Sequence, residues 1–114
     1  MKRLDFFDRD HVEIATAVAE EVVSVGGTVL LPTESFYGLG VDPRRDQAVD
    51  RVFDLKDRPG DLALPVVCAD WGQVESLVRI PDAFRVRLSR IWPAALTVVA
   101  PCCYPLPAAR ADTL

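Results

Sequence analysis

The sequence has little of what builds metal centres and membrane spans. It contains one histidine, His11, and three cysteines. Cys102 and Cys103 are adjacent and lack the spacing that paired zinc ligands need. No apolar run is long enough to cross a bilayer, and acidic residues interrupt the N-terminus before one develops. We therefore expect no metal site, no membrane association and a cytoplasmic protein.

An excess of positive charge is also missing. The formal net charge is -4 and the isoelectric point is about 4.9, which excludes nonspecific nucleic-acid binding by the surface as a whole. RNA binding would need a local patch, for which the candidates are Arg79, Arg85, Arg87 and Arg90. The P-loop and the G-x-G-x-x-G dinucleotide fingerprint are both absent.

The composition is that of a folded domain, since 50% of residues are hydrophobic and 26% are charged. We expect one domain over residues 1–114. Its first helix should span residues 10–25, with Asp8 or Asp10 as N-cap and Gly26 as the stop signal. The apolar face of that helix comprises Ile14, Ala15, Val18, Val22 and Val25.

Strands alternate with further helices along the chain. Short β-rich runs predict strands at residues 28–31, 64–68 and 96–100. Asp42 and Pro43 should begin a second helix that ends before Arg58. The buried stripe of that helix is Ala48, Val49, Val52 and Phe53, and two more helices should follow Asp70 and Pro81. The alternation favours an α/β (α+β) fold with some antiparallel pairing.

The segment at residues 31–60 carries two candidate binding features. The loop after the first strand supplies the hydroxyl groups of Thr33, Ser35 and Tyr37 beside glycines that allow close approach of a ligand. An ordinary turn would look similar. Lys56 and Arg58, at the end of the second helix, could converge on one phosphate or carboxylate. They could equally be partners of the helix dipole or of neighbouring aspartates.

Two stretches taken together, "GGTVLLPTESFYGLGVDPRRDQAVDRVFDLKDRP" and "IWPAALTVV", resemble the YrdC-like family of threonylcarbamoyl-AMP synthases. The order and separation of Gly-Gly, Pro-Thr-Glu, Tyr-Gly-Leu and Lys-x-Arg-Pro match the family pattern over about residues 10–114. The resemblance implies a twisted mixed β-sheet flanked by helices. Two places depart from the pattern, because Leu62 with Ala63 and Ala94 with Ala95 replace residues that the family usually has.

The resemblance also implies an enzyme that joins L-threonine, bicarbonate and ATP into threonylcarbamoyl-AMP, releasing pyrophosphate, for t6A modification of tRNA. By analogy Thr33 and Tyr37 would hold threonine. Lys56 and Arg58 would be the catalytic cations on the ATP phosphates and the carbamate, and Thr97 would line the nucleotide side. Mg²⁺ would come with the nucleotide, and downstream t6A transferase proteins would be partners.

Family domains continue, after a stretch like "ADTL", into an Ala-Val-Arg-x-Pro strand and a Ser-x-Asn loop. We therefore expect a partial domain, an N-terminal fragment whose C-terminal strands are missing. Unpaired sheet edge and exposed apolar surface would then favour marginal stability or association.

Three other functions fit parts of the sequence. A carbamoyltransferase domain working through carbamoyl-adenylate would use the same Lys-x-Arg-Pro site, and threonine dependence of ATP turnover separates the two enzymes. A double-stranded RNA or tRNA binding module would depend on Arg85, Arg87 and Arg90, against the acidic isoelectric point. A paralogue without activity would fit the substitutions at residues 62, 63, 94 and 95.

The 114-residue chain by itself should show little synthase activity, because the expected Arg and Ser-x-Asn segment is not part of it. The measurement is pyrophosphate release that depends on both threonine and bicarbonate. Release at a rate typical of enzymes, about 1 per second or more, would contradict this expectation.

Overall fold

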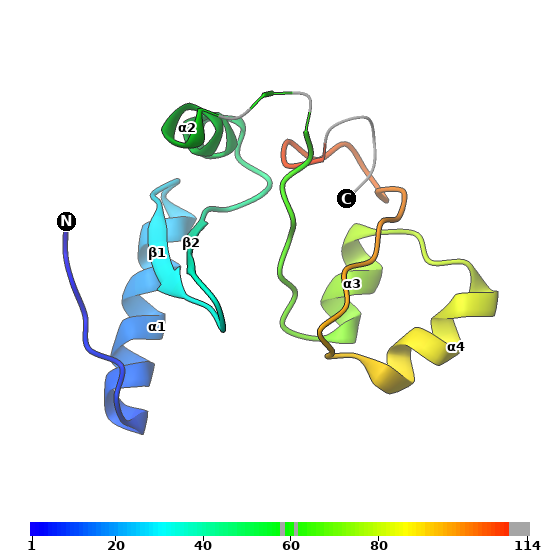
Figure 1. Cartoon of the computed structure of the whole chain (residues 1–114), viewed down its shortest axis with the longest axis horizontal. Helices are drawn as coiled ribbons and strands as arrows, with labels where there is room; N and C mark the ends of the chain where they lie inside the picture. The colour runs from blue at the N-terminus through cyan, green and yellow to red at the C-terminus, as the bar shows by residue number, and fades with distance from the viewer. Residues whose placement is uncertain (58, 61, 110–114) are drawn as a thin grey trace. The chain divides into compact units, whose positions relative to one another are not determined.

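The computed structural model describes residues 1–57, 59, 60 and 62–109. Its contacts divide the chain into two compact units, Met1–Val52 and Phe53–Leu114, and each is described by itself. The described residues form the helices and strands shown in Figure 1, namely α1 (Arg9–Ser24), β1 (Val29–Pro32), β2 (Tyr37–Gly40), α2 (Asp46–Lys56), α3 (Trp71–Leu77) and α4 (Asp82–Ile91). The expected α/β fold class is confirmed.

Helix α1 begins and ends at the predicted signals. The Asp8 carboxylate accepts a hydrogen bond from the His11 backbone N–H at 3.0 Å, which makes Asp8 the N-cap. At the other end Gly26 has a φ of 84°, a left-handed conformation that glycine adopts without strain. The N–H groups of Gly26 and Gly27 bond to the carbonyls of Val23 and Val22 at 3.0 and 2.8 Å. This is the Schellman motif, a common way to end a helix.

The apolar residues predicted for one face of α1 lie in this helix or at its C-cap, but they are not buried. No residue of the helix is buried, and the Ile14 side chain is 60% exposed. Val25 lies beyond the last helical turn, at the C-cap, and is 76% exposed. Within its unit the helix packs beside β1, and two layers this small cannot enclose a whole apolar stripe.

The strand predicted at residues 28–31 is confirmed as β1, but the following loop is shorter than expected. Residues 37–40 form β2, which pairs antiparallel with β1. Gly40 lies opposite Val29 in this ladder, and Gly38 lies opposite Leu31. A Cβ at position 40 would come within 3.1 Å of the Leu31 and Val29 side chains. Glycine at position 40 therefore leaves room for the large side chains of β1. Because glycine has a low strand propensity, the sequence does not predict a strand here.

Asp42 and Pro43 do not begin α2, contrary to the sequence prediction. The Asp42 carboxylate accepts hydrogen bonds from the Arg44 backbone N–H at 3.0 Å and from two nitrogens of the Arg44 guanidinium at 2.9 Å. The Arg45 N–H bonds to the Asp42 carbonyl at 3.2 Å. An Asp-Pro turn thus comes first, and the helix begins at Asp46.

The predicted buried stripe of α2 is confirmed. Ala48, Val49, Val52 and Phe53 are 6% exposed or less, and Val49 is fully buried. Their spacing places them on one side of the helix. After Lys56 the chain leaves the helix through Asp57, whose φ is 47°. A left-handed residue at this position is a usual helix ending.

In the second unit both predicted helices form, but neither of the two predicted strands does. The Asp70 carboxylate caps α3 by accepting from the Gln73 N–H at 2.8 Å, and α4 follows Pro81. Residues 64–68 and 96–100 are described but are not strands. Leu64 donates one backbone hydrogen bond, to Ala108, and a strand needs a neighbour that continues such pairing along its length.

An isolated antiparallel bridge lies in the described part of this unit. It joins Val78 to Cys102, with the Arg79 and Cys103 N–H groups bonded at 2.8 Å to the carbonyls of Pro101 and Leu77. The Trp71 and Trp92 rings meet edge to face, with centroids 6.4 Å apart. In the described part of the unit, the buried apolar residues are Phe53, Leu64, Val74, Ala100, Leu106 and Ala108.

Replacing Gly27 should destabilise the first unit. A Cβ at this position would lie 2.6 Å from Val22 Cγ1 and 2.7 Å from the Val22 carbonyl oxygen. Gly27→Ala should therefore cost about 2 kcal/mol in the free energy of unfolding, measured by urea denaturation followed by circular dichroism. Gly60→Ala is the matched control, since a Cβ there meets nothing within 4 Å. Equal stabilities of the two variants would contradict the steric argument.

The Asp42 turn should make stability depend on pH. The hydrogen bond from the Arg44 side chain lowers the pKa of the Asp42 carboxyl below its ordinary value of 3.8, although burial opposes the shift. Because the folded-state pKa is the lower one, the stabilisation is complete above pH 3.8 and is lost as the pH falls toward the folded-state pKa.

Asp42→Asn should remove this part of the pH dependence, measured as unfolding free energies between pH 7 and pH 3. Asp5→Asn removes a carboxylate from an exposed position and controls for the change in net charge. A parallel pH profile in wild type and Asp42→Asn would show that the turn carries no such linkage.

Candidate functional site

Thr33 lies in the four-residue turn that joins β1 to β2. Pro32 and Tyr37 are the last paired residues of the hairpin. The Thr33 hydroxyl donates to the Phe36 carbonyl at 2.5 Å and accepts from the Phe36 N–H at 3.2 Å, and the Thr33 N–H bonds to the same carbonyl at 2.9 Å. The turn therefore holds Thr33 in place through its own side chain.

These bonds determine what Thr33 can still offer a ligand. A hydroxyl has one proton to donate and two lone pairs to accept with. The proton is directed to Phe36 and one lone pair takes the Phe36 N–H. Since Thr33 is exposed, its remaining lone pair is accessible to a donor such as an ammonium or hydroxyl group.

Two aromatic side chains stand beside this hydroxyl along the chain. Tyr37 is 72% exposed and Phe36 is 81% exposed. Tyr37 is the first residue of β2 and is followed by Gly38. A phenol of this kind combines an apolar ring with a hydrogen-bonding tip, so Tyr37 could line a site for a small polar ligand.

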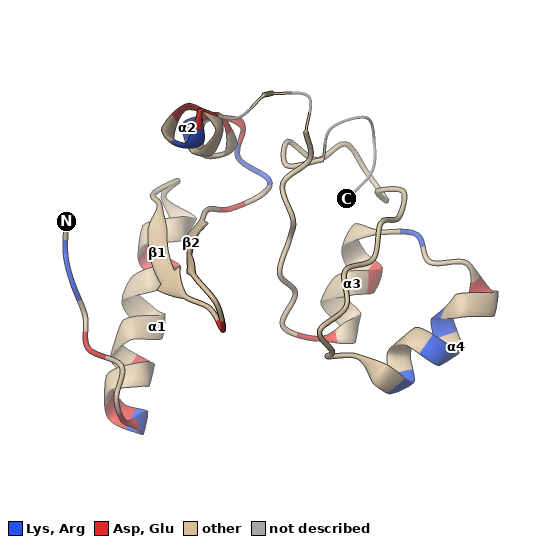
Figure 2. Cartoon of the chain, viewed as in Figure 1, with Lys and Arg blue, Asp and Glu red and all other residues tan. Residues whose placement is uncertain are grey.

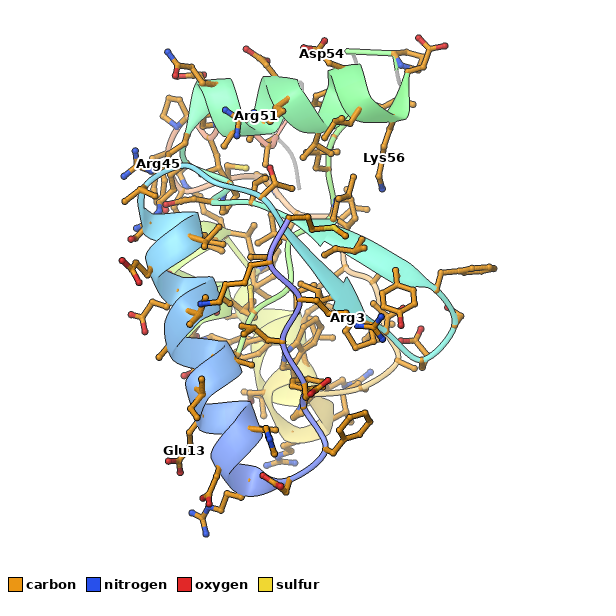
Figure 3. The ribbon with its side chains drawn as sticks, turned by 90° about the vertical axis from the view of Figure 1, so that its left-hand side faces the viewer. Arg3, Glu13, Arg45, Arg51, Asp54 and Lys56 are labelled. Atoms are coloured by element: carbon orange, nitrogen blue, oxygen red, sulfur yellow. The ribbon has the colours of Figure 1, made fainter. Side chains whose placement is uncertain are left out.

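Lys56 is the last residue of α2, and its side chain is exposed. Figure 3 shows it projecting from the final helical turn. In the part of the chain that the structure describes, no carboxylate forms an ion pair with Lys56, although Asp54 and Asp57 are close in sequence. An ammonium group of this kind is available to an anion, and it also complements the helix dipole.

The structure says less about two other predicted site residues, Arg58 and Thr97. Arg58 lies outside the described residues. Thr97 is exposed, in a segment that is not a strand. Thr33 and Tyr37 belong to the first unit, whereas Lys56 and Thr97 belong to the second. Each of these predicted site residues is therefore described only within its own unit.

The arginines proposed as an RNA patch are not all equivalent. Figure 2 shows basic residues along α4, but Arg85 forms an ion pair with Glu75 of α3. The hydrogen bond from Arg85 lowers the pKa of the Glu75 carboxyl, and the same bond raises the pKa of Arg85. Arg87 and Arg90 are exposed. One member of the predicted patch is therefore already engaged by a carboxylate.

The cysteines do not gather into a cluster among the described residues. None of the three is part of a disulfide, and that part of the chain has no group of three or more histidine, cysteine or acidic residues suited to a metal ion. Burial raises the pKa of the Cys68 thiol, with a smaller contribution from Asp70. A raised thiol pKa lowers nucleophilicity at neutral pH. Likewise, no described helix has the length and apolar character of a membrane span.

Sequence reasoning did not predict the roles of three residues around the hairpin: Asp42, Arg45 and Arg51. Asp42 is only 6% exposed. The guanidinium of Arg45 donates to the Ser24 carbonyl, and Arg51 donates to the Gly26 carbonyl at 3.1 Å. An Asp-Pro pair is a turn signal and could have identified the first residue. No local pattern marks the two arginines, because their partners lie 21 and 25 positions away.

Comparison with known proteins finds threonylcarbamoyl-AMP synthases among the relatives of this chain. The threonylcarbamoyl-AMP synthase of Bacillus subtilis is 37% identical over 99 residues, covering 86% of this chain and 28% of its own length. The synthase of Marinobacter nauticus is 37% identical over 86 residues, covering 75% and 45%. The chain thus spans less than half the length of these two curated relatives.

Solved structures agree with the sequence matches. A double variant of Sua5 from Pyrococcus abyssi has a TM-score of 0.80 and 34% identity, covering 90% of this chain and 32% of that chain. Sua5 from P. abyssi complexed with L-threonine has a TM-score of 0.75 and 31% identity, covering 96% and 32%.

The sequence profile of the Sua5/YciO/YrdC family, described as "Telomere recombination", matches residues 21–113. This range contains the hairpin with Thr33, all of α2 and the second unit up to its last residue but one. With most of its length matched in this way, the chain belongs to the Sua5/YciO/YrdC family.

Proposed function

We propose that this chain supplies the threonine-binding hairpin and the phosphate-binding helix end of a threonylcarbamoyl-AMP synthase. The observation that carries the proposal is the likeness to a Sua5 structure complexed with L-threonine, at 31% identity over 96% of the chain. The curated relatives carry the same enzyme name. The activity would serve t6A formation on tRNA in the cytoplasm, upstream of the transferase that consumes the adenylate.

The reaction sets an electrostatic task. The amino group of L-threonine takes up bicarbonate as a carbamate with loss of water. A carbamate oxygen then attacks the α-phosphorus of ATP, and the bond to pyrophosphate breaks. Anions adjacent to one another must be held during this attack, which is catalysis by positioning and by stabilising charge.

The residues fit separate parts of this task. Thr33 would accept a hydrogen bond from the ammonium or hydroxyl group of threonine through its remaining lone pair. Tyr37 would lie against the amino acid. Lys56, with Arg58 beside it in sequence, would hold the phosphates and the carbamate. Thr97 would line the nucleotide side, and Mg²⁺ would enter with ATP, held mainly by phosphate oxygens and water.

Threonine binding tests the hairpin. We expect L-threonine to bind the 114-residue chain in isothermal titration calorimetry, more tightly than L-valine, which lacks the hydroxyl group. Thr33→Val should weaken binding about tenfold or more, since a hydrogen bond to a charged group is lost. Thr16→Val changes an exposed threonine of α1 in the same way and is the matched control. Equal loss in both variants would argue against a role for Thr33.

Activity tests the helix end. Residues 21–113 would replace the segment they match in the M. nauticus synthase, and pyrophosphate release would be measured with and without threonine and bicarbonate. We expect release that needs both substrates, and a drop of about 100-fold with Lys56→Met, because charge stabilisation at the phosphates is lost. Arg87→Met removes an exposed cation from α4 and should have little effect. ATP turnover that is independent of threonine would favour a carbamoyltransferase instead.

A further inference from the structure

The two ends of the β1–β2 hairpin are joined by arginine side chains. The chain enters the hairpin from α1 through Gly26 and leaves it through the Asp42 turn. Arg45, within that turn, donates from its guanidinium to the Ser24 carbonyl, and its Nε is 3.8 Å from the Asp42 carboxylate. Arg51, in the second turn of α2, donates to the Gly26 carbonyl at 3.1 Å. Figure 3 shows both side chains close to the C-terminal end of α1.

The arginines bind the carbonyl of Ser24, the last residue of α1, and the carbonyl of Gly26, two residues beyond the helix. The last carbonyls of an α-helix have no partner within the helix and carry its partial negative charge. The bonds of Val25, Gly26 and Gly27 use the carbonyls of Glu21, Val23 and Val22. Ser24 and Gly26 then receive guanidinium donors. A planar, permanently charged donor suits this position.

Burial does little to hold the hairpin beyond this point. Leu30 is 58% exposed and Leu31 is 42% exposed, and the turn carrying Thr33 has the exposed Phe36 and Tyr37 beside it. Isolated two-stranded hairpins are marginal in water. The orientation of this one therefore depends on what fixes its base, which lies against the segment from Asp42 to Arg51.

We propose that Arg45 and Arg51 are positioning residues for the hairpin that carries Thr33 and Tyr37. By tying the C-terminal end of α1 to the beginning of α2, they keep the two strands in register and the Thr33 turn oriented for its ligand. This inference rests on the proposed threonine site, but the bonds at the hairpin base can be tested separately from that site.

Hydrogen exchange tests the attachment directly. Amide exchange across residues 29–40 would be followed by NMR in the 114-residue chain. Arg51→Met keeps the apolar stem of the side chain and loses its donors, and we expect exchange in the hairpin to become about fivefold to tenfold faster. Arg45→Met should act in the same direction, and Arg51→Lys, which keeps a donor, should restore much of the protection.

The control is Arg9→Met. Arg9 is 92% exposed at its side chain, and its recorded ion pair is with Glu13 within α1. Amides of α3 and α4 report whether each variant remains folded in the second unit. Unchanged hairpin exchange in both Arg45→Met and Arg51→Met would overturn the proposal.

Threonine affinity tests the positioning role. We expect the dissociation constant to rise about fivefold in Arg51→Met, to recover in Arg51→Lys and to stay at the wild-type value in Arg9→Met. Faster hairpin exchange with unchanged threonine affinity would overturn the role in binding. If wild type binds no threonine, the proposed threonine site fails, whereas hydrogen exchange still decides whether the arginines hold the hairpin.

Discussion

The carbonyl groups at the C-terminal end of α1 must find donors, and the first unit is arranged around how they do. Gly26 turns the chain with a left-handed conformation, and its own amide and that of Gly27 bond back to the helix. Arg45 and Arg51 then supply the donors that the backbone cannot. This one requirement links α1, the base of the hairpin and α2. The position of the Thr33 turn follows from it.

The features that the sequence predicts well depend only on residues that are close together in the chain. The caps at Asp8 and Asp70 need only an oxygen three positions before an amide, and the Gly26 stop needs only a residue free of Cβ strain. The buried side of α2 is visible in its periodicity. For these elements, position and type follow from local geometry.

The features that the sequence predicts poorly depend on distant partners. Residues 64–68 and 96–100 have strand composition, but composition does not provide a neighbouring strand to pair with, and neither forms a strand. Residues 37–40 have unfavourable composition yet form β2, because β1 lies beside them. Helix α2 begins later than predicted because the Asp42 carboxylate interacts with the two arginines that follow it. These interactions stabilise a turn in place of the first helical residues.

The candidate site shows the same division. The order of the motifs was sufficient to identify the family, whose profile matches residues 21–113. The sequence did not reveal that the Thr33 hydroxyl is committed to its own turn, nor that Arg85 is occupied by Glu75. Both facts concern which atoms are already bonded, and residue types alone do not specify that.

Helix α1 is held at its ends more than along its side, since none of its residues is buried. Both the heat-capacity change and the denaturant dependence of unfolding scale with the surface that becomes newly exposed. Unfolding of this helix exposes little surface that is not already in contact with solvent. Its unfolding should therefore carry a small heat-capacity increment and a shallow denaturant slope, and its helicity should decline gradually with temperature.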